Sequence, residues 1–158
     1  MAQDERKAVR SSPVALTVKQ QREMARLEFA KAKLLLSEAD TIHKMGKAHG
    51  GAVRAAYYAM EHAACAAILL FGGVGEAKGF PKSHRHIMAH FGTFAAKDVL
   101  LDQYGGLLSQ VYGLREIADY SATSHPGRAD AEFAVGAARD FLSACATKWK
   151  ATIDPVAL

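Results

Sequence analysis

The sequence predicts an all-α protein, an antiparallel bundle of four to five helices. Apolar residues recur at helical spacing in each long segment, and no segment shows the alternation of a β-strand. Only four prolines occur among the 158 residues, and alanine, the strongest helix former, is abundant. Half of the residues are hydrophobic and 23% are charged, which is typical of a folded globular chain.

The predicted helices span about residues 15–45, 53–71, 83–95, 102–120 and 129–150. The second is the clearest, because its apolar residues follow the i, i+3, i+4, i+7 pattern without interruption. Glycines at 46, 50 and 51 predict a turn before it, and the Gly72-Gly73 pair predicts its end. Ser83 is the expected N-cap of the third helix.

The first helix has an apolar stripe within an arc of about 100°. The stripe consists of Met24, Leu27, Leu34, Leu35, Ile42 and Met45. Lys31 and Glu38 interrupt it. We expect this stripe to face the core of the bundle.

We divide the chain into a disordered basic leader (1–15), the helical bundle (16–150) and a C-terminal tail (151–158). The net charge is +4, and residues 1–33 hold eight Lys and Arg against four Asp and Glu. The remaining residues balance at twelve against twelve, since the totals are 20 and 16. This neutral body argues against a broad basic face for duplex DNA.

Cys65 and Cys145 both lie in apolar helical patterns, where we expect them to be buried and structural. Two free cysteines suit a reducing compartment, so we expect a cytoplasmic protein. The N-terminal segment has no apolar signal-peptide core. The longest apolar run, residues 63–71, is too short to span a bilayer, and we expect no membrane partner.

Arg115 is the most informative single residue of the sequence. Its helical angle places it between Leu108 and Val111, on the apolar face of the fourth helix. A guanidinium cannot lose its charge there, so its burial requires partners. Asp119, one turn later, is one expected partner. A second partner is Tyr58 or Glu61 of the second helix, a residue of another protomer, or a bound phosphate. An ordinary local ion pair at the edge of the bundle is the alternative.

A polar strip also follows the second helix beside its apolar face. It consists of Arg54, Tyr58, Glu61 or His62, and Cys65. Polar strips on two facing helices are how bundle proteins build ligand sites, and also how helices meet a dimer partner.

Two other motifs resemble ligand-binding motifs, but we interpret both as having no binding role. The glycine-rich connector at 72–82 follows a helix and lacks the Gly-Lys-Ser/Thr ending of a phosphate-binding loop, so we interpret it as a flexible connection. His86 and His90 lie four apart on one helical face, but no further ligand completes a metal set. We therefore expect neither a metal nor a cofactor.

Three segments occur in an order that is typical of one family: RAAYYAMEHAA at 54–64, KSHRHIMAHFG at 82–92 and YGLREIADYS at 112–121. In these segments the chain resembles the HEPN family (higher eukaryotes and prokaryotes nucleotide-binding domain). The resemblance is to the branch with an Arg-x-x-Ala-Asp-Tyr motif and covers about residues 20–150. It implies an antiparallel helical bundle that is commonly a homodimer. Many members are encoded beside a minimal nucleotidyltransferase, in toxin–antitoxin or defence systems.

Active members of that family are metal-independent ribonucleases with an Arg-x4–6-His motif on the fourth helix, and two motifs meet across the dimer. This sequence departs from that pattern, because Tyr120 stands where the histidine is expected after Arg115. A tyrosine is nearly un-ionised at pH 7 and is a poor general base. The pair Arg85 and His90 matches the motif literally, but on the third helix, and we interpret it as a chance match.

We therefore expect catalytic residues, if there is catalysis, among Arg115, Asp119 and Tyr120, and a ligand bound by Arg54, Tyr58 and His84. The leading hypothesis is an HEPN protein of a toxin–antitoxin or defence-type system that binds a nucleotidyltransferase partner, a nucleotide or RNA. One alternative is a metal-independent ribonuclease toxin with a dimeric active site. A second alternative is a structural dimerisation module without a ligand.

Overall fold

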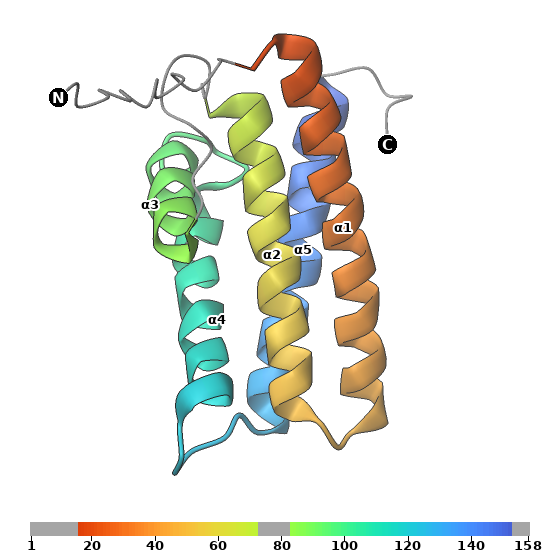
Figure 1. The fold of residues 1–158 in the computed structure, drawn as a ribbon, viewed down its shortest axis with the longest axis vertical. Helices are drawn as coiled ribbons and strands as arrows, with labels where there is room; N and C mark the ends of the chain where they lie inside the picture. Colours follow the sequence, from red (N-terminus) through yellow and green to blue (C-terminus); the bar gives the residue numbers. More distant parts are fainter. Residues whose placement is uncertain (1–15, 73–82, 153–158) are drawn as a thin grey trace, which may run out of the picture.

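The computed structural model describes residues 16–72 and 83–152 and confirms the all-α fold. The helices are α1 (Val18–Met45), α2 (His49–Phe71), α3 (His84–Ala95), α4 (Asp102–Tyr120) and α5 (Arg128–Thr152). No strand occurs within these two described ranges. The long helices α1, α2, α4 and α5 alternate in direction, so the bundle is antiparallel, and the short α3 lies beside α4 (Figure 1). The predicted leader and nearly all of the predicted tail lie outside the described residues.

The helix ends follow from local hydrogen bonding. Thr17 caps α1 with a reciprocal capping box: its hydroxyl accepts from the Gln20 amide at 3.2 Å, and the Gln20 side chain accepts from the Thr17 amide at 2.9 Å. Gly46 ends α1 in the left-handed region, with φ of 70°, which glycine adopts without strain. Ser83 caps α3 as predicted, accepting from the His86 amide at 3.3 Å.

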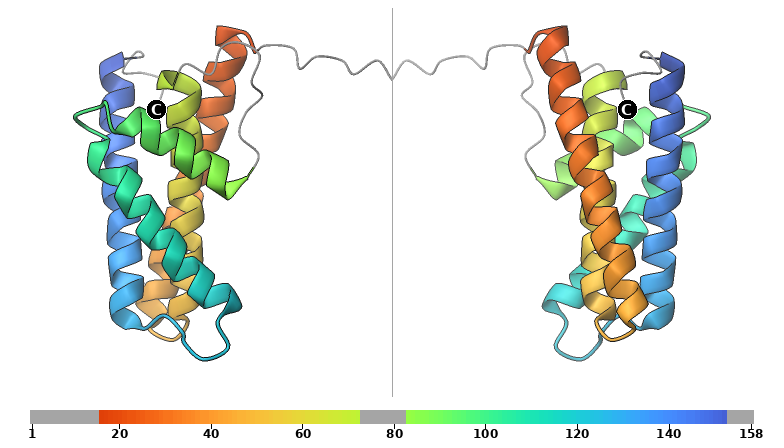
Figure 2. Two further views of the ribbon diagram at one scale, coloured as in Figure 1. Left: turned by 90° about the vertical axis from the view of Figure 1, so that its left-hand side faces the viewer. Right: turned by 90° about the vertical axis from the view of Figure 1, so that its right-hand side faces the viewer.

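Helix α2 occupies the centre of the molecule and packs against each of the other four helices. Eight of its 15 buried residues are alanines, and their small side chains let the neighbouring helices approach on several sides. Helices α3 and α4 are both inclined to α2 and slope in the same sense (Figure 2). A Cβ on Gly105 of α4 would lie 3.4 Å from the Cα of Gly92 of α3, so two glycines allow these helices to approach closely.

The predicted start of the second helix was wrong by about one turn. The helix begins at His49, so Gly50 and Gly51 lie in its first turn instead of in the connection. A Cβ on Gly50 would lie 3.4 Å from the Cβ of Ala118. The glycine signal at this position therefore reflects close packing of α2 against α4 as well as the turn at Gly46.

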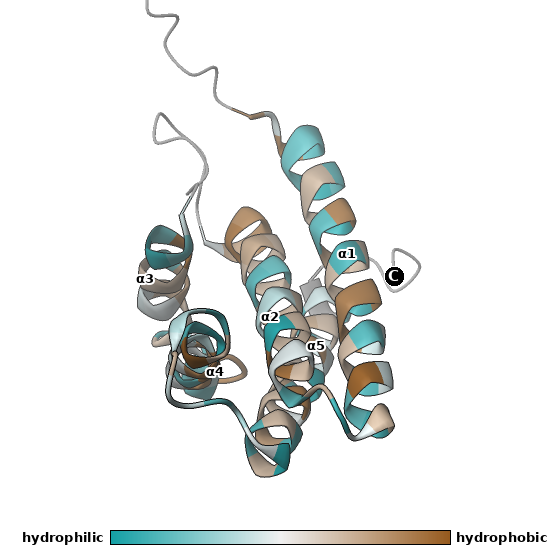
Figure 3. Cartoon of the chain, turned by 60° about the horizontal axis from the view of Figure 1, so that its bottom comes forward, coloured by the Kyte–Doolittle hydropathy of each residue, from teal (hydrophilic) through white to brown (hydrophobic). Residues whose placement is uncertain are grey.

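The predicted register of α1 was wrong for half of its stripe. Met24, Leu35 and Ile42 pack against the core, but Leu27, Leu34 and Met45 are exposed. The fully buried positions of α1 are Ala25, Phe29, Ala32 and Ala39. Hydrophobic residues consequently recur along α1 among hydrophilic ones (Figure 3). The core side of α1 is lined mainly by small alanines because it packs along α2, and alanine contributes little to a hydropathy stripe.

Aromatic side chains fill the rest of the core. The Phe141 ring centroid lies 5.1 Å from that of Phe91 and 5.0 Å from that of Tyr104, which ties α5 to α3 and α4. Cys65 and Cys145 are buried, as predicted, and burial raises the pKa of both thiols. Such thiols are structural rather than nucleophilic. None of the described helices combines the length and the apolar character that crossing a membrane requires.

Two matched leucine substitutions test this packing. Leu108 on α4 is 1% exposed and Leu34 on α1 is 73% exposed. Leu108→Ala should therefore lower the free energy of unfolding by about 2–5 kcal/mol, because it opens a cavity. Leu34→Ala should change it by no more than about 0.5 kcal/mol. Urea unfolding followed by circular dichroism measures both values, and a comparable loss in the two variants would contradict the observed register of α1.

Candidate functional site

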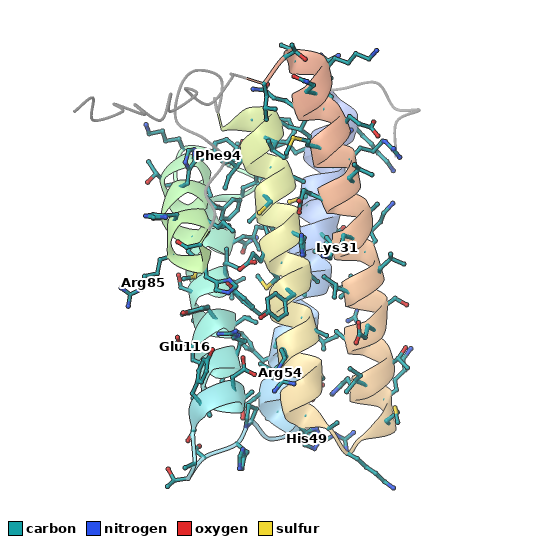
Figure 4. The ribbon with its side chains drawn as sticks, in the orientation of Figure 1. Lys31, His49, Arg54, Arg85, Phe94 and Glu116 are labelled. Atoms are coloured by element: carbon teal, nitrogen blue, oxygen red, sulfur yellow. The ribbon has the colours of Figure 1, made fainter. Side chains whose placement is uncertain are left out.

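Polar and aromatic side chains from three helices meet on one side of α2, in a group that we call the polar cluster. It consists of Arg54, Tyr57, Tyr58 and Glu61 from α2, His84 from α3, and Tyr112, Arg115, Asp119 and Tyr120 from α4. Figure 4 shows Arg54 on the lower part of α2, and Arg85 and Glu116 projecting from α3 and α4.

Arg115 is buried, with 7% of its surface exposed. Its Nη2 donates to the Tyr58 hydroxyl at 3.1 Å, which links α4 to α2. Its Nε lies 2.8 Å from Asp119 Oδ2, one turn along α4, although the N–H is not directed at that oxygen. Burial alone would lower the pKa of Arg115, but Tyr58 and Asp119 raise it above its ordinary value, so the side chain stays charged.

Asp119 is shared between two arginines. While Oδ2 faces Arg115, Oδ1 accepts from Arg54 Nε at 2.6 Å across the α2–α4 interface. Arg54 is much more open than Arg115, with 46% of its side chain exposed. Two guanidinium charges thus face one carboxylate, and this trio has a net charge of +1.

Three tyrosine rings surround the Arg115 guanidinium. Its Cζ lies 6.0 Å from the ring centroid of Tyr57, 5.8 Å from that of Tyr58 and 5.5 Å from that of Tyr120. Cation–π contacts of this kind offset part of the lost hydration of a buried charge. Tyr120 differs from the other two because it is 74% exposed. One face of the site is therefore an accessible aromatic ring beside a guanidinium.

A second hydrogen-bond network lies on the other side of Tyr57 and Tyr58. The Tyr57 hydroxyl donates to Glu61 Oε2, and His84 Nδ1 binds the same carboxylate oxygen. The Tyr57 hydroxyl also lies 3.1 Å from His84 Nδ1. Burial and the Glu61 carboxylate raise the pKa of Tyr57, so its hydroxyl keeps its proton. Glu61 therefore binds to His84 and Tyr57, and not to either arginine of the trio.

All of the site residues predicted from the sequence, Arg54, Tyr58, His84, Arg115, Asp119 and Tyr120, lie in the polar cluster. Among the partners considered for Arg115, Asp119 and Tyr58 contact it. The sequence analysis named Glu61 only as one of several alternatives. It placed Tyr57 on the apolar face of the second helix by its spacing, and the ring is indeed buried. The signal that could have identified this pair is their spacing of four on one helix, which allows a side-chain hydrogen bond.

The literal motif match on α3 lies outside the polar cluster. Arg85 and His90 are five residues apart, so they lie about 140° apart around the helix. Arg85 is exposed and projects away from α3 (Figure 4). Among the residues that the structure describes, no group of three or more His, Cys, Asp or Glu is placed to hold a metal ion.

A family model for the HEPN domain matches residues 22–149 of the chain. The matched segment includes nearly all of the helical bundle and every residue of the polar cluster. The chain therefore belongs to the HEPN domain family. A search of curated protein sequences found no match to it.

Removing the shared carboxylate tests how the buried charge is held. Asp119→Asn should lower the free energy of unfolding by about 3 kcal/mol or more, because it leaves a buried guanidinium without its counter-charge. Arg54→Gln removes the exposed partner of the same carboxylate and should cost no more than about 1 kcal/mol. Chemical denaturation of both variants gives the two values. Equal, small losses would show that Tyr58 alone suffices to hold Arg115.

Proposed function

We propose that this HEPN protein acts in a toxin–antitoxin or defence-type system by binding a phosphate group of RNA or of a nucleotide at the polar cluster. The observation that carries this proposal is the sharing of Asp119 by two arginines. The single negative charge of Asp119 balances only one of the two guanidinium charges. The other positive charge is therefore available to a bound anion. The positive charge lies at the surface through Arg54 and is anchored in the bundle through Arg115.

The donors that remain on the two guanidiniums fit a phosphate. Each guanidinium carries five N–H groups in a rigid fork. Within the described part of the chain Arg54 donates through Nε and Arg115 donates through Nη2, while Arg115 Nε lies beside Asp119 Oδ2 without a directed hydrogen bond. Unused N–H groups of both side chains therefore supply the planar, paired donors that suit phosphate oxygens.

The aromatic side of the site favours a nucleotide over a simple anion. Tyr120 presents an exposed ring 5.5 Å from the Arg115 guanidinium carbon. Tyrosine rings stack on unpaired nucleobases, and this stacking depends little on base identity. Since the body of the chain is neutral, a short single-stranded segment or a mononucleotide fits better than a duplex.

Membership of the HEPN family supports two protein partners. The first is a second copy of this chain, and α4 carries exposed Ile117 and Tyr120 next to the site. The second is a minimal nucleotidyltransferase. Sedimentation at micromolar concentration tests the first, since we expect a homodimer and a monomer would count against it. Co-purification with the product of an adjacent nucleotidyltransferase gene tests the second.

Ribonuclease activity is the second candidate function, and one observation favours it. The His84–Glu61 pair provides a histidine within the polar cluster, although none follows Arg115 at the family spacing. A dimerisation module without a ligand is the third candidate. It does not explain why a guanidinium with unused donors is buried beside an exposed tyrosine.

Substitution of Arg115 tests the proposal directly. Arg115→Ala should weaken binding of a fluorescein-labelled single-stranded RNA at least tenfold, measured by fluorescence anisotropy. The slope of log K against log salt should become shallower by about 0.7, since one phosphate contact is lost. Arg115→Lys should restore little of the affinity, because one ammonium cannot reproduce the planar fork.

The matched control is Arg139→Ala, which removes an exposed arginine that pairs with Asp40 away from the cluster. This variant should bind RNA like the parent. Melting temperatures of all variants accompany the binding data. An Arg115→Ala variant that melts much earlier yet binds RNA normally would make Arg115 a structural residue and would contradict the proposal.

A further inference from the structure

One row of side chains on α1 faces away from the core. Its members are spaced alternately three and four residues apart, which is the spacing of the contact positions in a coiled coil. The row, which we call the α1 seam, consists of Met24, Leu27, Lys31, Leu34, Glu38, Thr41 and Met45. Met24 is half-buried and the other six residues are exposed.

The α1 seam has no neighbour within the described part of the chain. Helix α1 packs against α2 and α5 and against no other described helix. Leu27, Leu34 and Met45 project from the side of α1 opposite to its fully buried residues. Helices α1 and α4 lie on opposite sides of α2, so the seam is remote from the polar cluster (Figures 1 and 3). Exposed apolar residues gathered on one helix face indicate an interaction surface.

The two charged residues of the seam fit a second copy of this helix. Lys31 precedes Leu34 by three residues, and Glu38 follows Leu34 by four. In an antiparallel pair of α1 helices with Leu34 at the two-fold axis, Lys31 of each copy therefore lies level with Glu38 of the other. Within one chain the two side chains are about 10 Å apart along the helix and do not pair. Neither takes part in an ion pair among the described residues.

The remaining seam residues match in the same arrangement. Leu34 lies against its own counterpart at the axis. Leu27 and Thr41 each lie seven residues from Leu34, on either side, so they face each other across the pair. Met24 lies ten residues before Leu34 and Met45 eleven residues after it, so the two methionines also face each other. Apolar side chains thus occupy the centre and both ends of the contact.

We propose that α1 docks antiparallel onto α1 of a second copy of this chain through the α1 seam, with Leu34 at the two-fold axis. A parallel pair in register is disfavoured, because it would place Lys31 against Lys31 and Glu38 against Glu38. The contact goes beyond the proposed phosphate binding and uses no residue of α4 or of the polar cluster. It therefore leaves the phosphate site of each copy open.

Leu34→Cys reports on this contact alone. A disulfide joins two cysteines only when their Cβ atoms are about 4 Å apart, which residues at a two-fold axis can satisfy. The native cysteines are buried, so the new thiol is the one that is accessible. Full-length protein at micromolar concentration is equilibrated in a glutathione redox buffer, and the disulfide-linked dimer is measured on a non-reducing gel.

The matched control for this measurement is Lys33→Cys. Lys33 is exposed and adjacent in sequence, but it lies about 100° from Leu34 around the helix. We expect the ratio of linked dimer to monomer to be about tenfold or more higher for Leu34→Cys than for Lys33→Cys.

Reversal of the charges tests the orientation of the pair. In the Leu34→Cys background, Lys31→Glu places two carboxylates opposite each other at two points and should lower the dimer ratio about tenfold. Glu38→Lys should have the same effect with two ammonium groups. The double variant Lys31→Glu/Glu38→Lys exchanges the signs and should restore the ratio to within about twofold. All of these side chains are exposed, so the variants should keep the parent melting temperature.

Two results would overturn the inference. Equal cross-linking of Leu34→Cys and Lys33→Cys would show that a second copy does not cover the seam and would leave this face to a partner of another kind. Single and double charge variants that cross-link alike would exclude the antiparallel arrangement, because a parallel pair gains nothing from the exchange of signs.

Discussion

The charge of Arg115 is the constraint on which the functional side of this bundle depends. A guanidinium on the inner face of α4 cannot shed its charge, and it is stable there only with partners at hand. Asp119 supplies the counter-charge from the same helix, and Tyr58 supplies a hydrogen-bond acceptor from α2. Since Asp119 also binds Arg54, the buried charge fastens α2 to α4 at two points. The same sharing leaves the excess positive charge that we assign to ligand binding.

The rest of the fold brings these groups together through small residues. Helix α2 contacts all four neighbours because alanine lines its buried surface. Gly50 lets α2 approach α4, and the Gly92–Gly105 contact lets α3 pack closely on α4. Helix α3 in turn holds His84 against Tyr57 and Tyr58 of α2. Close backbone approach thus joins the phosphate-binding side of the cluster to its histidine.

The sequence predicted the elements of this fold well and their contacts unevenly. Helical periodicity located the helices, and a charge at an apolar position identified Arg115 and required the partners that it has. Half of the predicted stripe of α1 is exposed because Ala25, Ala32 and Ala39 pack by their small size, which a hydropathy pattern does not detect. The Tyr57–Glu61–His84 network was not predicted, because it depends on the angle at which α3 crosses α2. No local pattern determines that angle.

The most direct test of the central claim is a proton–nitrogen NMR spectrum of the arginine side chains, recorded while adenosine 5′-monophosphate is added. The Nε–H of Arg115 should exchange slowly with solvent and shift on addition, together with that of Arg54, because both guanidiniums face the same carboxylate and the same anion. Arg139, paired with Asp40 at the surface, is the internal reference and should not shift. Equal shifts at all three arginines, or none at Arg115, would contradict an anion site built on its buried charge.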